Sequence, residues 1–113
     1  MIGIGASSRM FLYRGSVDMR RGFDGLSGIV REELSEDPMS GTLFVFLNRS
    51  RDKIKILYWD RDGYAIWTKR LEQGRFALPP EGGGVIGMAE LALLLDGVSV
   101  RVVKRSARWI KAA

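Results

Sequence analysis

The strongest alternation of apolar and polar positions lies in the middle of the chain, between residues 42 and 71. Three β-rich runs cover residues 42–47, 53–59 and 64–71. A basic loop, NRSRD, separates the first two runs, and a DRDG turn separates the second from the third. Short loops between such runs are typical of hairpins, so the pattern predicts a three-stranded antiparallel meander over residues 42–71.

A helical period precedes the meander. Asp18 is a plausible N-cap, and the pattern predicts a helix over residues 18–34. Its apolar side chains recur every three or four residues and would share one helix face. They are Met19, Phe23, Leu26, Val30 and Leu34. Before this helix, residues 10–14 read as a short strand, and Gly15 with Ser16 reads as a turn.

Three glycines, Gly22, Gly25 and Gly28, interrupt the predicted helix. Each one costs a helix about 1 kcal/mol relative to alanine. Their spacing would form a flat strip, so we expect a strand or another backbone to pack closely there. A short or frayed helix is the alternative.

The rest of the chain completes an α+β fold. Residues 88–95 predict a short helix, and residues 98–103 predict a final strand. We therefore expect an antiparallel sheet with the main helix against one face. Residues 1–103 would form a single domain, and we interpret residues 104–113 as a basic tail outside it.

The DRDG turn suggests a register for the hairpin that it joins. The expected pairs are Trp59 with Tyr64, Leu57 with Ile66, Lys55 with Thr68, and Lys53 with Arg70. These side chains would share one face of the sheet, because side chains alternate across a strand.

The opposite face is then the better candidate for the core. It would carry Ile54 and Ile56 from the middle strand. Across the basic loop, we expect Phe44 and Phe46 to lie beside Ile56 and Ile54. This register predicts the main helix on the face with all four side chains.

Charge is concentrated in the same region. The 113 residues carry a formal net charge of +5. Residues 49–80 hold eight basic and four acidic side chains, a net +4, whereas residues 1–48 are net −1. A basic region with interleaved aromatic residues favours nucleic acid or an acidic partner.

Composition excludes several kinds of chemistry. The chain has no Cys and no His, which removes disulfides, thiolate nucleophiles, the usual zinc sites and Ser-His-Asp triads. Asp60 and Asp62 could form a carboxylate pair, but a hairpin turn explains them at lower cost. We expect no enzyme activity, metal or cofactor, no small-molecule substrate, and no membrane partner because no long apolar run occurs. The cytoplasm is the expected location.

The first sheet face is the candidate nucleic-acid site. Phosphates would meet the cations, and bases would stack on the rings. The candidate residues are Arg49, Arg51, Lys53, Lys55, Arg70, Trp59 and Tyr64. The alternative is that Trp59 and Tyr64 form a cross-strand pair that stabilises the hairpin, with the charges serving only solubility.

Several segments together resemble the small accessory protein, often called TnpB, of bacterial insertion sequences of family sixty-six. They are Asp18-Met19-Arg20-Arg21-Gly22-Phe23-Asp24-Gly25-Leu26, Asp37-Pro38, Ser40-Gly41, Leu43-Phe44-Val45-Phe46, Asn48-Arg49, 52–60, Gly63 and 69–76. The resemblance spans about residues 15–95. It implies a role in transposition beside a separate, larger transposase that carries the acidic catalytic residues.

Two functions follow as hypotheses. The first is a non-catalytic accessory factor that binds element DNA through the basic sheet face. The second is an adaptor that binds the transposase or another element-encoded protein, with Trp59, Tyr64 and Leu57 as its interface. An enzymatic role is the third hypothesis.

Overall fold

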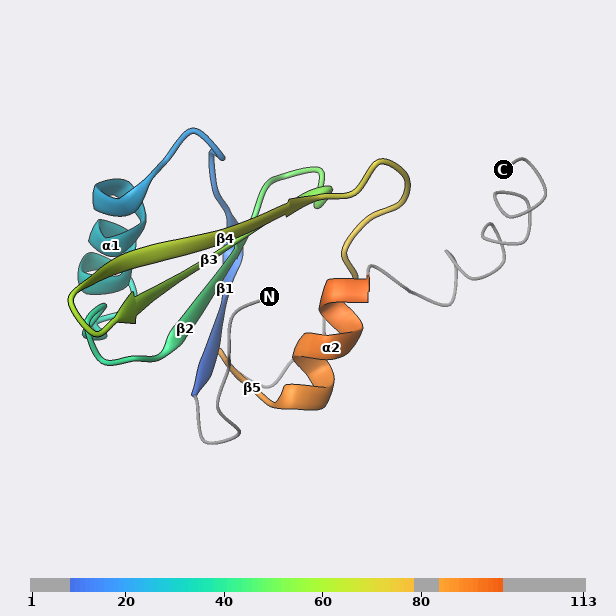
Figure 1. The fold of residues 1–113 in the computed structure, drawn as a ribbon. Coiled ribbons are helices and arrows are strands. Elements are labelled where there is room, and N and C mark those ends of the chain that lie inside the picture. Colours follow the sequence, from blue (N-terminus) through green and yellow to red (C-terminus); the bar gives the residue numbers. More distant parts are fainter. Residues whose placement is uncertain (1–8, 79–83, 97–113) are drawn as a thin grey trace.

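The computed structural model describes residues 9–78 and 84–96, which form a five-stranded sheet between two helices (Figure 1). The strands are β1 (Met10–Ser16), β2 (Leu43–Leu47), β3 (Lys53–Asp60), β4 (Gly63–Arg70) and β5 (Val85–Ile86). The helices are α1 (Phe23–Glu32) and α2 (Met88–Asp96). The α+β class is as expected, and α2 lies where residues 88–95 predicted a helix. The expected strand at 98–103 and the basic tail lie outside the described residues.

The sheet is mixed, so the expectation of an antiparallel sheet is wrong at one pairing. The strand order is β4-β3-β2-β1-β5. The strands β2, β3 and β4 are antiparallel neighbours, but β1 pairs with β2 in parallel. The reason is the helix between them: a strand, a helix and a second strand joined in this way form a parallel β-α-β unit. The strand β1 also continues through Gly15 and Ser16, where we expected a turn.

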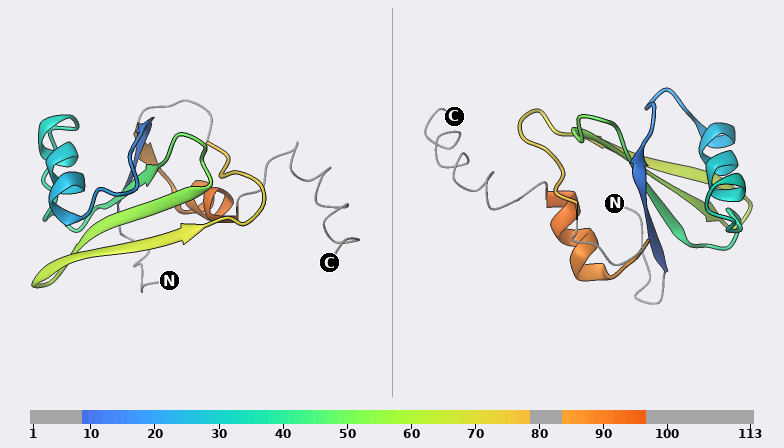
Figure 2. Two further views of the ribbon diagram at one scale, coloured as in Figure 1. Left: turned by 90° about the horizontal axis from the view of Figure 1, so that it is seen from above. Right: turned by 180° about the vertical axis from the view of Figure 1, so that it is seen from behind.

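Both faces of the sheet are covered, as Figure 2 shows from two further directions. The α1 side buries Val17, Leu26, Ile29, Val30, Phe44, Phe46 and Leu57. The α2 side buries Met10, Leu12, Leu43, Val45, Leu47, Ile54, Ile56, Phe76, Ile86, Leu91 and Leu94. The central strand β2 is buried along its whole length, which is typical of a strand covered on both sides.

The hairpin register agrees with the sequence, but the neighbouring register is shifted by one residue. Lys53 pairs with Arg70, and Trp59 pairs with Tyr64, as predicted. Between β2 and β3, however, Phe44 pairs with Leu57. A shift of one residue moves a side chain to the other face. The helix α1 therefore covers Phe44, Phe46 and Leu57, and Ile54 and Ile56 face α2 instead.

The loop between β2 and β3 explains the shift. The Asn48 amide donates to the Lys53 carbonyl at 3.2 Å, and the Lys53 amide donates to Asn48 Oδ1 at 3.0 Å. Arg51 has φ 57°, a left-handed conformation that non-glycine residues adopt only occasionally. The closed loop places Asn48 directly opposite Lys53, one position away from the expected alignment.

The helix α1 begins later than expected, at Phe23. Gly22 is its N-cap residue. Asp18 instead accepts the Arg20 backbone amide at 2.8 Å, so it caps a turn before the helix. Phe23 was expected on the buried face, but it is 50% exposed because it opens the first turn.

The glycine strip is not a close contact. A Cβ at Gly22 or Gly28 would meet nothing within 4 Å among the described residues, and one at Gly25 would meet Arg21 Cβ at 3.1 Å. The prediction of backbone packing at this strip is therefore wrong. Gly25 and Gly28 instead line a hollow along α1.

Replacing Gly28 with alanine is expected to stabilise the fold by about 0.5–1 kcal/mol. The new methyl group meets open space, and alanine loses less backbone entropy in a helix. Urea unfolding would measure the change. Gly41→Ala is the control: Gly41 has φ 90°, so the same substitution should destabilise the protein. A lower midpoint for Gly28→Ala would contradict the open geometry.

Candidate nucleic-acid interface

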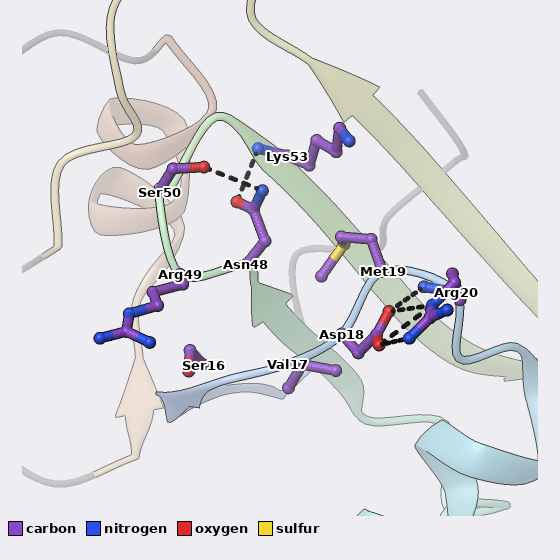
Figure 3. Close-up of a pocket in the computed structure, with 9 residues that line it drawn as sticks. All are labelled: Ser16, Val17, Asp18, Met19, Arg20, Asn48, Arg49, Ser50 and Lys53. Carbon is purple, nitrogen blue, oxygen red and sulfur yellow. Dashed lines mark hydrogen bonds and ion pairs between the residues drawn. The ribbon is translucent and has the colours of Figure 1, made fainter.

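A hollow lies where the parallel strands β1 and β2 both end. Their carboxyl ends meet at one edge, since Ser16 pairs with Leu47 and the Val17 amide donates to the Leu47 carbonyl at 3.0 Å. The hollow measures about 630 Å³. It is lined by Ser16, Val17, Asp18, Met19, Arg20, Asn48, Arg49, Ser50 and Lys53 (Figure 3). In open α/β sheets, crevices beyond the carboxyl ends of the parallel strands are the usual ligand sites.

One wall of the hollow is the loop from β2 to β3. The Asp52 carboxylate accepts from Asn48 Nδ2 at 2.6 Å and from Ser50 Oγ at 2.8 Å. These hydrogen bonds, Asn48 first, lower the pKa of Asp52. The loop is thus held by its own side chains, and it carries Arg49 exposed beside the hollow.

The other wall is the turn between β1 and α1. Arg20 Nη2 lies 2.7 Å from Asp18 Oδ2, and Arg20 Nε donates to the same carboxylate. These side-chain hydrogen bonds, with the one from the Arg20 amide, lower the pKa of Asp18 to about 2. Figure 3 shows Met19 between this ion pair and Lys53.

The Asp18–Arg20 ion pair should make the stability of the protein depend on pH. Because the folded pKa of Asp18 is depressed, its contribution to stability is present above about pH 4 and is lost as the pH falls toward 2. In an NMR titration, the Asp18 carboxyl should titrate near pH 2. In Arg20→Ala it should move back toward 3.8. An unchanged midpoint in that variant would mean that the pair does not form in solution.

The candidate cations fall into two groups. Arg49 and Lys53 line the hollow, and Arg70 lies opposite Lys53 in the register. Arg70 Nε also donates to Glu72 Oε2 at 3.0 Å. Arg51 follows in the same loop, and its carbonyl accepts the Phe76 amide at 2.7 Å. Arg49, Arg51, Lys53 and Arg70 thus belong to one edge of the sheet.

Lys55 lies apart from this edge. Its Nζ donates to the Arg21 carbonyl at 2.9 Å, just before α1 begins. The amine is therefore engaged in holding the entry of the helix against β3. The expectation of an open sheet face is wrong here, because α1 covers it.

The two rings lie at the far end of β3. Trp59 and Tyr64 pack edge to face, with centroids 5.1 Å apart and planes at 84°. Six residues along a strand is roughly 20 Å, so Trp59 is far from Lys53. Leu57, which we placed in an exposed interface, is fully buried. The cations and the rings do not form one surface.

The site also contains Arg20, Asn48 and Ser50, which were not predicted from the sequence. The hollow depends on the parallel pairing of β1 with β2, which was not predicted. The sequence nonetheless contained a sign of this site. Two segments that carry the family resemblance, one containing Asp18 and Arg20 and one containing Asn48 and Arg49, form its two walls.

Two further features of the described residues concern metal ligands and membrane-spanning helices. Within residues 9–78 and 84–96, no three His, Cys, Asp or Glu side chains gather as metal ligands would. Neither helix in that part of the chain is long and apolar enough to cross a membrane.

Comparison with known proteins identifies the family of the chain. Residues 8–105 match the family model described as IS66 Orf2 like protein. The chain is 40% identical over 103 residues to uncharacterized protein y4hO of Sinorhizobium fredii, covering 89% of this chain and 90% of that protein. It is 38% identical over 107 residues to y4jC of the same organism, covering 93% and 92%. No solved structure matches. The chain therefore belongs to the IS66 Orf2-like family, whose role is that of an accessory protein in transposition.

Proposed function

We propose that this protein is a non-catalytic accessory factor that binds element DNA through the basic hollow at the ends of β1 and β2. The observation that carries the proposal is the grouping of Arg49, Lys53 and Arg70 at one edge of the sheet, with Arg51 in the adjoining loop. Within residues 9–78 and 84–96, Arg49, Arg51 and Lys53 form no ion pair. Their charge is available to phosphates.

The proposed contacting residues differ from the candidates that the sequence suggested. Arg49 and Lys53 are the principal phosphate contacts, with Arg51, Arg70 and Arg20 beside them. Lys55, Trp59 and Tyr64 play a structural part, because the lysine anchors the entry of α1 and the rings pack on each other. Few cations contribute, so we expect modest affinity, with a Kd on the order of 1–100 µM at physiological salt.

The adaptor function is the second candidate, and exposed apolar side chains favour it. Leu93 on α2 is 61% exposed, and Val85 on β5 is 53% exposed. Exposed apolar side chains of this size are found in interfaces between proteins. These side chains differ from those that the sequence suggested, since Leu57 is buried.

Capture of the tagged protein from cells that carry the complete element separates the two functions. If the protein acts through DNA, element DNA is recovered and the transposase is lost after nuclease treatment. The double variant Arg49→Ala/Lys53→Ala should recover neither the element DNA nor the transposase. If the transposase remains after nuclease and is lost only in Leu93→Ser, the adaptor function is correct and the proposal fails.

A further inference from the structure

The described helices carry a single basic residue, Arg31 in the last turn of α1, whereas a groove-reading helix needs several cations. Asp24, Glu32 and Glu33 line the hollow along α1, with only Arg21 of opposite sign. In the described part of α2, the exposed side chains are Ala89, Glu90, Ala92 and Leu93. Helices that read the major groove place polar and basic side chains against bases and phosphates. The fold therefore does not favour binding along the groove of a duplex.

The basic hollow has the mixed chemistry of a nucleotide site. Its floor includes buried Val17 and half-buried Met19, while Arg49 and Lys53 stand at its sides. Figure 3 shows the thioether of Met19 in the space between the two walls. Its volume of about 630 Å³ falls within the range of small-ligand pockets. An apolar floor beside cations fits a ligand with a flat apolar part and an adjacent anion.

We propose that the hollow receives one unpaired nucleotide of a DNA strand. The base lies against Met19, whose sulfur makes favourable contacts with aromatic rings. The phosphates on the two sides of this nucleotide lie near Arg49 and Lys53. This inference rests on the proposed function, and it adds that the protein distinguishes unpaired strands from duplex DNA.

The position of the base explains why an unpaired strand should bind more tightly than a duplex. A base inside a duplex is stacked and paired, and bringing it into a hollow requires unstacking. A base in a single-stranded overhang has already lost its partner, so it enters without that cost. Phosphates of a duplex can still reach Arg49 at the rim, because that side chain is exposed. Both DNA forms should bind, but the unpaired form should bind more tightly.

Fluorescence anisotropy with the full chain tests the inference on three labelled DNAs of equal duplex length. One is blunt, one has a three-nucleotide overhang, and one has the same overhang with abasic sites. The overhang should bind at least about tenfold more tightly than the blunt duplex. The abasic overhang should lose most of that gain. Equal affinity for all three would overturn the inference and leave the proposed function intact, whereas no binding at all would overturn both.

Variants assign the preference to the hollow. Met19→Ala should reduce the preference for the overhang by about three- to tenfold and leave the blunt duplex within twofold. Met39→Ala is the matched control, since Met39 is 53% exposed and does not line the hollow. Circular dichroism would show that both variants are folded. Retention of the full preference in folded Met19→Ala would overturn the inference.

A free nucleotide is the other source of this chemistry. Deoxynucleoside monophosphate should displace the overhang only at millimolar concentration, because it offers a single phosphate. Displacement at low micromolar concentration would assign the hollow to free nucleotides and overturn the inference.

Discussion

Replacing Phe46 with alanine is expected to destabilise the protein by about 3–5 kcal/mol. Phe46 has no exposed surface, and it lies at the centre of the sheet between β1 and β3, under α1. Its ring also packs on Tyr13 with centroids 5.7 Å apart. A loss of this size is a large part of a typical domain stability of about 5–15 kcal/mol. Urea unfolding would show a much lower midpoint or an unfolded variant.

Two further variants keep this prediction testable. Phe46→Leu preserves part of the apolar volume, so it should unfold at an intermediate urea concentration if the alanine variant does not fold. Met39→Ala, at an exposed position, should change stability by less than about 0.5 kcal/mol. A change below about 1 kcal/mol for Phe46→Ala would contradict the buried position.

A double-mutant cycle tests the corrected register. Phe46 and Leu57 belong to the same cluster under α1, so their substitutions should couple by more than about 0.5 kcal/mol. Phe46 and Ile56 lie on opposite faces, so that pair should be closer to additive. Strong coupling to Ile56 and none to Leu57 would support the register that the sequence suggested.

The second large effect concerns binding. The double variant Arg49→Ala/Lys53→Ala should weaken DNA binding by about 10- to 100-fold, because each charged contact is worth about 1.5 kcal/mol or less at an exposed site. The loss should be similar for all sequences, since phosphates carry no sequence information. Anisotropy titration at low salt would measure it.

A control with the same loss of charge separates local contacts from net charge. Arg31 lies in the last turn of α1 and Arg61 lies in the turn between β3 and β4, both outside the basic hollow. Arg31→Ala/Arg61→Ala should keep most of the affinity. If the two double variants weaken binding equally, the hollow is not the site and only the overall charge attracts DNA.

The hairpin of β3 and β4 could be predicted pair by pair, because the DRDG turn and the alternation of side chains agree. The register of β2 could not. It depends on a loop closed by Asn48 and on a left-handed conformation at Arg51. An arginine in the sequence gives no sign of such a conformation. Coverage of both faces was predictable in principle, since residues 43–47 form an uninterrupted apolar run.

The candidate site could be predicted only in part. Arg49 and Lys53 were found from charge and strand position. Arg20 and Asn48 joined them only through the parallel pairing of β1 with β2, which brings distant segments to one edge. The stacking role of Trp59 and Tyr64 was inferred from a shared face, but sharing a face does not make residues roughly 20 Å apart neighbours.

The salt dependence of binding tests the central claim most directly. If phosphates bind at the basic hollow, the logarithm of the association constant should fall linearly with the logarithm of salt concentration. With three or four contacts to an unpaired strand, the slope should be about −2 to −3. In Arg49→Ala/Lys53→Ala the slope should become flatter by about 0.7 for each lost contact. A slope near zero, or no binding of the parent protein even at low salt, would contradict the account.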